Sequence, residues 1–376
     1  MWHADPVTVI GRVEHVGSLL RPGYLRDARD ARAAGELTAA QFKATEDRAV
    51  REVVALQEEL DLPVINDGEF RRESFQSEFT AACGGFAGVD LNAWLWGDWH
   101  SAQVGDLSIP RPAELAVVAP VRKHRNLAAE EFSYLRGCAS RPVKITLPSP
   151  TLFANLWSPG RSAEAYPNLD AFMADVVEVL CDEVRELVRL GCTHIQLDAP
   201  HYPLLIDPTW RAFYEQRGWP AARWLSYGIE LDNAVIGAGR PATFGFHLCR
   251  GNQLSRWLVA GGYDAIAGPV FRGVHADRLL LEYDDERSGS FDPLGLVPDD
   301  KVVVLGLVTT KTSVVEAPEA IESRIREASR VVGLDRLAVS PQCGFATSVA
   351  GNEITPQAQR AKLALLVRVA RQVLGG

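Results

Sequence analysis

The chain has 376 residues, of which 47% are hydrophobic and 23% charged, and its formal net charge is −9. The length suits one large domain or two of medium size, and the composition is that of a soluble globular protein. The negative charge argues against nucleic acid or an anionic membrane as a partner, because both attract basic surfaces. No apolar run is long enough to span a bilayer, and the N-terminal residues lack the features of a secretion signal.

The six cysteines are widely spaced, which in a chain of this length indicates a reducing cytoplasm rather than a disulfide framework. Cys181 and Cys192 lie in or beside an apolar-periodic segment and are expected to be core thiols. Cys249 and Cys343 instead follow apolar, β-prone runs and stand next to glycine and polar residues. These two are therefore the cysteines from which chemistry is expected.

Short apolar runs alternate along the chain with segments of helical periodicity. In chain order, the predicted elements are helix 44–60, strands 62–69 and 141–150, helix 170–191, strand 192–200, a helix ending at 238, strands 242–249, 278–285 and 301–310, helix 317–333, strand 337–344 and helix 355–374. Apolar strands alternating with helices predict a parallel sheet, and about eight such units predict one α/β domain over residues 1–376, a (β/α)₈ TIM barrel. A doubly wound open sheet is the alternative, and the lack of a glycine-rich phosphate loop makes it less favoured.

The segment from Phe86 to about Ser140 interrupts this alternation. It holds three tryptophans, Trp94, Trp96 and Trp99, and strand-like stretches such as residues 113–122. We interpret residues 86–140 as an inserted antiparallel hairpin or lid. Packing over the barrel mouth is the favoured role, and direct contact with a substrate is the alternative.

Polar residues follow the predicted strands at the ends where barrel enzymes build their active sites. They are Asp67, Glu69, Asp198, His247, Cys249, Glu282 and Cys343. His247 and Cys249 are two residues apart, so on a strand they point to the same face. With Cys343 as a distant third donor, they predict a zinc site.

Glu282 is the predicted fourth ligand, because it directly follows the apolar residues 279–281 and should still lie on the strand. A solvated carboxylate is the alternative for Glu282, and His275 is a competing ligand. Two thiolates, an imidazole and a carboxylate suit a zinc ion that activates a thiol: the incoming sulfur displaces the carboxylate and loses its proton near neutral pH. A buried His–Cys pair without a metal is the competing interpretation.

Seven motifs carry a resemblance to a known family. They are "EHVGSLLRP", "NDGEFRRESF", "HIQLDAP", "FHLCRGN", "LEYDDERSG", "LGLVTTKT" and "SPQCGFAT", spread from about residue 11 to 355. Together they resemble the short, single-barrel members of the cobalamin-independent methionine synthase family. The larger enzymes of that family carry an additional N-terminal half, so this chain is expected to correspond to the catalytic half alone.

The resemblance implies zinc held by His247, Cys249, Glu282 and Cys343. It also implies a site for an amino-acid thiol, in which Gly17 and Ser18 bind the substrate carboxylate and Glu69 and Asp198 hold its ammonium group. Two carboxylates at strand ends suit that ammonium. The alternatives are a helix N-cap before Pro200 for Asp198, and an ion pair with Arg71 or Arg72 for Glu69.

Three positions depart from the family pattern. Lys311 stands where the larger enzymes have a histidine that assists proton transfer, so it is a candidate acid or anion clamp. Ala199 replaces a carboxylate that follows the acidic strand. The family's folate-stacking tryptophan has only a loose counterpart, Trp157, which a core or rim position would explain equally well.

The expected activity is zinc-dependent transfer of a methyl group to homocysteine or a close analogue, through a zinc-bound thiolate, from methyltetrahydrofolate or a simpler donor. Lys311 and Asp198 are the candidate catalytic residues, and a homo-oligomer is possible. The alternative is epoxide opening by the thiol of coenzyme M, whose sulfonate would require basic residues such as Arg21, Arg71, Arg72, Arg250 and Lys311. A non-enzymatic zinc-binding protein and a metal-free porphyrinogen decarboxylase are less favoured.

Overall fold

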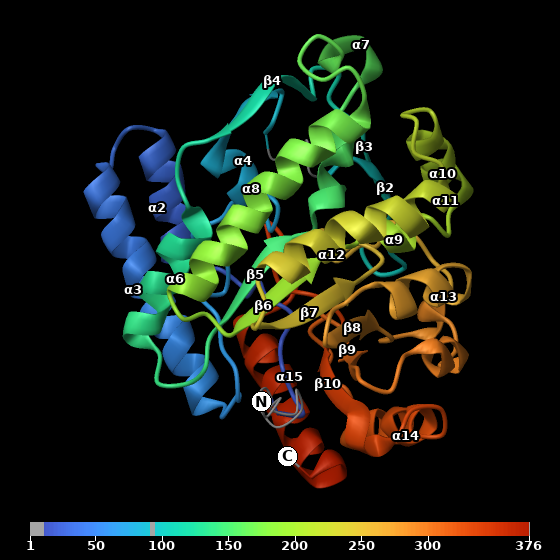
Figure 1. Ribbon diagram of the computed structural model, residues 1–376. Helices are drawn as coiled ribbons and strands as arrows, with labels where there is room; N and C mark the ends of the chain where they lie inside the picture. Colours follow the sequence, from blue (N-terminus) through green and yellow to red (C-terminus); the bar gives the residue numbers. More distant parts are fainter. Residues whose placement is uncertain (1–10, 91–94, 376) are drawn as a thin grey trace.

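The computed structural model describes residues 11–90 and 95–375. Its centre is a sheet of six parallel strands in the order β10-β9-β8-β7-β6-β5 (Figure 1). The strands are β5 (Lys144–Pro148), β6 (His194–Asp198), β7 (Thr243–Leu248), β8 (Arg278–Glu282), β9 (Val302–Val308) and β10 (Leu337–Pro341). Apart from Thr243 their residues are all buried, as expected of parallel strands covered on both faces.

Two extended segments near the N-terminus continue this sheet at its two edges. Val13 bridges to Val339 of β10, and Ile65 bridges to Val143 beside β5, both in parallel. The two segments also meet each other, since the Leu19 amide donates to the Gly68 carbonyl at 3.1 Å. Eight chain segments thus surround one core, and the predicted (β/α)₈ architecture is confirmed.

Helices cover the outside of this ring. The α-helices are α2 (Gly23–Ala33), α3 (Ala39–Glu59), α4 (Ser77–Ala82), α6 (Leu127–Cys138), α7 (Pro159–Ser162), α8 (Leu169–Arg189), α9 (His201–Leu204), α10 (Pro208–Glu215), α11 (Ala221–Arg223), α12 (Ile229–Ala238), α13 (Asp264–Gly273), α14 (Pro318–Ala328) and α15 (Pro356–Val369). Short 3₁₀ segments are η1 (Pro150–Leu156), η3 (Glu286–Ser288), η4 (Asp292–Leu296) and η5 (Leu334–Arg336), and π-turns are η2 (Trp224–Gly228) and η6 (Ala370–Leu374).

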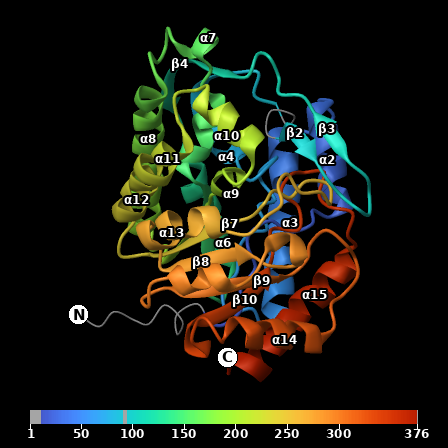
Figure 2. The same ribbon diagram turned by 90° about the vertical axis from the view of Figure 1, so that its right-hand side faces the viewer.

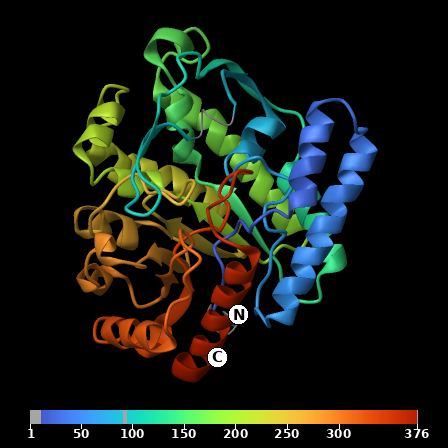
Figure 3. The same cartoon turned by 180° about the vertical axis from the view of Figure 1, so that it is seen from behind.

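The first and last long helices lie side by side, as a closed ring requires (Figure 3). Arg360 of α15 donates to the Glu59 carboxylate of α3 at 2.8 Å. Thr38 caps the N-terminus of helix α3, and its side chain and that of Gln41 form a reciprocal capping box. None of the helices among the described residues is long and apolar enough to cross a membrane.

The inserted segment forms two antiparallel ribbons. β1 (Cys83–Ala87) pairs with β4 (Ala116–Lys123), and β2 (Gly97–Trp99) pairs with β3 (Leu107–Ile109). The predicted boundaries of 86–140 need correction, because the ribbons occupy 83–123 and residues 127–138 form helix α6 before β5. Trp94 lies outside the described residues. The backbones of His100 and Trp257 exchange two hydrogen bonds, which tie the β2–β3 ribbon to the loop after β7 (Figure 2).

Six of the seven predicted barrel strands are present, each shorter than predicted. Residues 62–69 contribute only the bridge at Ile65. Gly68 (φ 70°) and Glu69 (φ 59°) both adopt the left-handed conformation, which turns the chain out of an extended path. This turn brings the Glu69 side chain to the barrel mouth.

Candidate metal and substrate site

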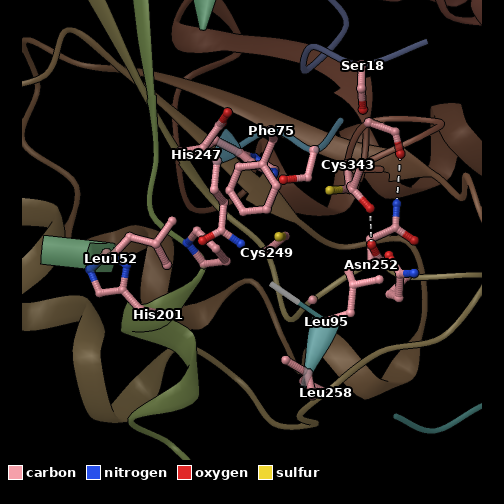
Figure 4. A pocket seen from close by; sticks show the side chains of 18 of the residues that line it. Ser18, Phe75, Leu95, Leu152, His201, His247, Cys249, Asn252, Leu258 and Cys343 are labelled. Carbon is pink, nitrogen blue, oxygen red and sulfur yellow. Dashed lines mark hydrogen bonds between the residues drawn. The ribbon is translucent and has the colours of Figure 1, made fainter. Parts of the chain in front are cut away.

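A cavity lies at the carboxyl ends of the barrel strands, under the inserted ribbons. Figure 4 shows part of its wall, with Cys249, Cys343 and His247 on one side and the apolar residues Leu95 and Leu258 on another. Ser18, Glu69 and Asp198 also line it. The structure therefore brings most of the residues predicted from the sequence into one place.

Three of the four predicted metal ligands form a compact group. Nδ1 or Nε2 of His247 and the sulfurs of Cys249 and Cys343 all lie within 4.8 Å of one another, and all three residues are buried. Neither ring nitrogen of His247 has a hydrogen-bond partner. One buried imidazole and two thiols, with nitrogens left unpaired, form a donor set that fits zinc, which prefers nitrogen and sulfur ligands.

The two thiols differ in acidity. A hydrogen bond from the Cys343 thiol, together with the charge of His247, holds the pKa of Cys249 well below its usual value despite burial. Cys249 is thus the sulfur that carries negative charge most readily. A thiolate is the form of cysteine that binds metals.

Glu282 is fully buried beside this group, which excludes the solvated position considered for it. Its carboxylate accepts hydrogen bonds from the Arg250 amide at 2.6 Å and from the Arg287 side chain at 2.8 Å. Burial raises the pKa of Glu282, but nearby cations, with Lys311 the strongest, lower it to about 2. Glu282 is outside the group of three donors that lie within 4.8 Å of one another. The competing ligand His275 is exposed and precedes β8 at the opposite end of the barrel.

Lys311 lies behind Glu282 and does not line the cavity. Its ammonium is 3.6 Å from a Glu282 oxygen and 3.7 Å from Asp284, and it is only 6% exposed. It makes no hydrogen bond within the usual distance. This position suits a residue that holds Glu282 by charge rather than one that contacts a substrate.

The two predicted acids both line the cavity. Thr146 donates to one oxygen of Glu69 at 2.8 Å, and the second oxygen is buried without a partner. Gln196 donates to Asp198 at 2.7 Å. Burial raises the pKa of Asp198 to about 7. A buried carboxylate oxygen without a donor is unfavourable, so this corner of the cavity is suited to a cationic group of a ligand.

The alternatives considered for these acids are not realised. Arg71 pairs with Asp47, and Arg72 pairs with Glu131, so neither forms an ion pair with Glu69. Helix α9 begins after Pro200 without a side-chain cap, so Asp198 does not act as its N-cap. Both carboxylates therefore remain directed to the cavity.

Gly17 and Ser18 lie where the first barrel segment meets the last. A β-carbon at Gly17 would collide with a Glu69 oxygen, so only glycine lets this carboxylate approach the backbone. A β-carbon at Gly344 would likewise collide with the Ser18 hydroxyl. The Ser18 carbonyl also accepts from the Phe345 amide at 2.8 Å. These contacts set Ser18 beside the loop that carries Cys343.

Trp157 is not brought together with the other candidates. Its indole donates to the Tyr166 carbonyl at 3.2 Å, it is 7% exposed, and it belongs to the hydrophobic core. Aromatic residues of other segments line the cavity instead. They are Phe75, Trp96, Trp99 and Trp210. Trp96 and Trp99 come from the inserted segment, which therefore contributes to the wall as well as packing over it.

The five basic residues considered for a sulfonate do not line the cavity. Arg21 donates to four backbone carbonyls, and Arg250 donates to the carbonyls of Gly261, Glu282 and Ser288. Arg71, Arg72 and Lys311 face carboxylates. These cations therefore bind backbone carbonyls and carboxylates of the protein around the cavity.

Besides Phe75 and Trp210, two further groups of site residues were not predicted from the sequence. Asn252 donates to the Gly344 carbonyl at 2.7 Å and to Thr310, which fixes the loop carrying Cys343. His201 lines the cavity and is bonded through Nε2 to Thr151 at 2.7 Å. Beneath them, the buried Asp232 accepts from Ser149 and Tyr202 at 2.5 Å each. The "RGN" triplet was the available signal for Asn252, whereas nothing in the sequence links Asp232 to His201.

Asp232 predicts a pH-dependent stability. Burial raises the pKa of Asp232 from 3.8 to about 7, so its contribution to the free energy of unfolding is full below 3.8 and is lost as the pH rises through about 7. Asp232→Asn cannot ionise. Between pH 3.8 and about 7, the native protein is therefore expected to lose stability relative to this variant. The difference in free energy of unfolding should grow by up to about 1.4 kcal/mol per pH unit. Urea unfolding at several pH values tests this, and a difference independent of pH would contradict it.

Comparison with known proteins agrees with this geometry. Residues 14–372 match the family model described as the catalytic domain of cobalamin-independent synthase. The chain is 35% identical to an uncharacterized protein, YxjH, of Bacillus subtilis, over 96% of this chain and 94% of the relative. It is 28% identical to a 5-methyltetrahydropteroyltriglutamate–homocysteine methyltransferase of Rhodococcus jostii, over 88% of this chain but only 40% of that longer protein.

Solved structures show the same fold. A candidate vitamin-B12-independent methionine synthase from Listeria monocytogenes superposes with a TM-score of 0.72 at 25% identity, covering 96% of this chain and 97% of the other. A B12-independent methionine synthase from Shewanella gives a TM-score of 0.71 at 19% identity, covering 97% and 98%.

Proposed function

Because the chain belongs to the family of cobalamin-independent synthase catalytic domains, we propose that it transfers a methyl group to the thiol of homocysteine or a close analogue. One observation carries the proposal: a buried His–Cys–Cys group and a pair of partly unsatisfied carboxylates line the same cavity. The first suits a metal that binds sulfur, and the second suits the ammonium group of an amino acid. An acceptor that bridges them has a thiol at one end and an amine at the other.

His247, Cys249 and Cys343 would hold zinc, with Glu282 as the fourth ligand, and zinc there would supply a Lewis acid that lowers the pKa of a thiol. Glu69 and Asp198 accept hydrogen bonds from the acceptor's ammonium group. The Ser18 hydroxyl, beside Gly17, binds its carboxylate. Trp96 and Trp99 exclude water above the sulfur. Lys311 acts on Glu282 as a positioning residue, because its charge keeps that carboxylate ionised.

The test is X-ray absorption at the zinc edge on the purified protein, with and without homocysteine. Zinc present in one equivalent, with one sulfur gained and one oxygen lost on adding homocysteine, is the expected result. Zinc whose shell does not change with homocysteine would contradict an amino-acid acceptor. A protein that binds no zinc would overturn the proposal.

Glu282→Gln is expected to weaken zinc retention less than a change of either cysteine. Glu282 would be the one oxygen ligand beside an imidazole and two thiolates, and zinc prefers nitrogen and sulfur donors, so the carboxylate would contribute least to zinc affinity. Zinc occupancy after dialysis against a graded series of chelator measures this. Equal losses from Glu282→Gln, Cys249→Ser and Cys343→Ser would instead identify Glu282 as an ordinary structural ligand.

A further inference from the structure

The two acids of the cavity wall are each held by a neutral hydrogen-bond donor from the barrel interior. Thr146 of β5 donates to Glu69, and Gln196 of β6 donates to Asp198. Both donors are buried, and neither of them lines the cavity. Each bond occupies one carboxylate oxygen, and the donor itself brings no positive charge to the acid.

The direction of the bond from Gln196 is set by a lysine. Lys144 is buried, and its ammonium group donates to the side-chain oxygen of Gln196 at 2.8 Å. An ammonium group can only donate, so the Gln196 amide turns its oxygen to Lys144 and its NH₂ group to Asp198. In the opposite orientation the NH₂ group would face the ammonium and the oxygen would face the carboxylate, and both hydrogen bonds would be lost.

Lys144 is itself held by acceptors for all three of its protons. Besides Gln196, its ammonium donates to Glu14 at 2.8 Å and to the His15 carbonyl at 2.7 Å. Burial raises the pKa of Glu14, but the charges of Lys144 and Arg278 lower it to about 2, so Glu14 is ionised at neutral pH. An ammonium group with three acceptors and a compensated charge is fixed in one position.

The same order of groups recurs behind Glu69. Arg72 is buried and donates to the Thr146 hydroxyl at 3.2 Å and to the Thr146 carbonyl at 2.9 Å. A guanidinium group only donates, so the hydroxyl oxygen accepts from Arg72 and its single proton is left for Glu69. The charge of Arg72 is compensated by Glu131, whose carboxylate lies 2.6 Å away.

Strand geometry explains why both acids share this arrangement. Lys144 and Thr146 are two residues apart on β5, so their side chains point to the same face. Gln196 and Asp198 are likewise two residues apart on β6, and Thr146 is paired with Gln196 across the two neighbouring strands (Figure 1). Lys144 therefore lies a layer below the acids, farther from the carboxyl ends of the strands and from the cavity.

From these contacts we infer that Lys144 and Arg72 are positioning residues for the amino-acid substrate, acting through Gln196 and Thr146. They fix the direction of two hydrogen bonds and so hold Asp198 and Glu69 in place for the ammonium group. The second oxygen of Glu69, which has no hydrogen-bond partner, is left for the ligand. The inference rests on the proposed function. It means that selection of an amino acid over an acid without an amine depends on residues outside the cavity lining.

The experiment measures binding to the zinc-loaded protein by calorimetry, so no methyl donor is required. The ligands are methionine, the product of the proposed transfer to homocysteine, and 4-(methylthio)butanoate, which has the same thioether and carboxylate but no amine. Gln196→Met keeps the length of the side chain and removes the donor. Its Kd for methionine is expected to rise about 5- to 30-fold, whereas its Kd for 4-(methylthio)butanoate should stay within about twofold of that of the native protein.

Lys144→Met tests whether the lysine acts through Gln196. This variant leaves Glu14 its ion pair with Arg278. It is expected to weaken methionine binding about as much as Gln196→Met does, again without an effect on 4-(methylthio)butanoate. The two changes combined should cost no more than Gln196→Met alone, because both interrupt the same chain of contacts. Losses that add, or equal losses for the two ligands, would contradict a role through Gln196.

Thr146 offers a matched pair of variants at the other acid, which also decides the matter if Lys144→Met does not fold. Thr146→Val removes the hydroxyl and keeps the shape, so its Kd for methionine is expected to rise about 5- to 30-fold. Thr146→Ser keeps the hydroxyl and should bind methionine as the native protein does. Equal binding by these two variants would overturn the inference and leave the proposed function intact. A native protein that binds methionine no more tightly than 4-(methylthio)butanoate would overturn both.

Discussion

Cys249→Ser is expected to lower the rate of methyl transfer at least about 100-fold, because changes to residues that merely support a metal ligand already cost 10- to 100-fold. Serine is nearly isosteric with cysteine, but its hydroxyl is a poor ligand for zinc and stays protonated at neutral pH. The loss should therefore appear in zinc content and turnover together. Metal analysis and an assay of thioether formation on the same sample measure both.

Cys181→Ser is the matched control for this change. Cys181 is also a buried thiol, but it lies in α8, its sulfur donates to the Ala234 carbonyl, and it does not line the cavity. It should keep zinc and activity. A Cys249→Ser protein that retained both zinc and full turnover would refute the mechanism. Circular dichroism would reveal a Cys249→Ser protein that is unfolded, and the same measurements would then be made on Cys249→Ala.

Asp198→Asn is expected to lower kcat/KM for homocysteine about 30-fold or more, the usual cost of removing one partner of a buried charge pair. Asparagine keeps the shape of the side chain and can still accept the hydrogen bond from Gln196. What it removes is the charge that pairs with the acceptor's ammonium group. Steady-state kinetics with varied homocysteine measures the loss.

The control for Asp198→Asn is a second acceptor rather than a second variant. 4-Mercaptobutanoate has the thiol and the carboxylate of homocysteine but no amine. The native protein and Asp198→Asn should use it with kcat/KM values within about threefold of each other. An equal loss on both acceptors would mean that Asp198 shapes the cavity without binding an ammonium group.

Local patterns in the sequence were sufficient for the barrel. Apolar runs such as residues 302–308 have one stable position, buried between helices, so the strands were predictable from periodicity. The failure at residues 62–69 has a local cause, since the left-handed backbone at Gly68 and Glu69 ends the extended path after Ile65. The inserted ribbons were foreseen as antiparallel, but the apolar helix α6 was assigned to them because helix and strand patterns are hard to tell apart in a short segment.

For the candidate site, the sequence was informative where ligand positions depend on local spacing. His247 and Cys249 lie two residues apart at the end of one strand, and the structure brings Cys343 to them. It was less informative where a role depends on which side chains meet across the barrel. Lys311 is directed to Glu282 rather than the cavity, and Trp157 is in the core, because packing partners distant in sequence decide both positions. For the same reason, the sequence did not identify Phe75 and His201 as residues that line the cavity.

The contact between Ser18 and Gly344 has a consequence for the order in which the protein is made. One wall of the cavity comes from the first barrel segment and another, with Cys343, from the loop after the last strand. A ribosome must therefore finish β10 before these two walls can meet. Until then the growing chain carries His247 and Cys249 without Cys343, and the cavity can form only after the loop that follows β10 has been made.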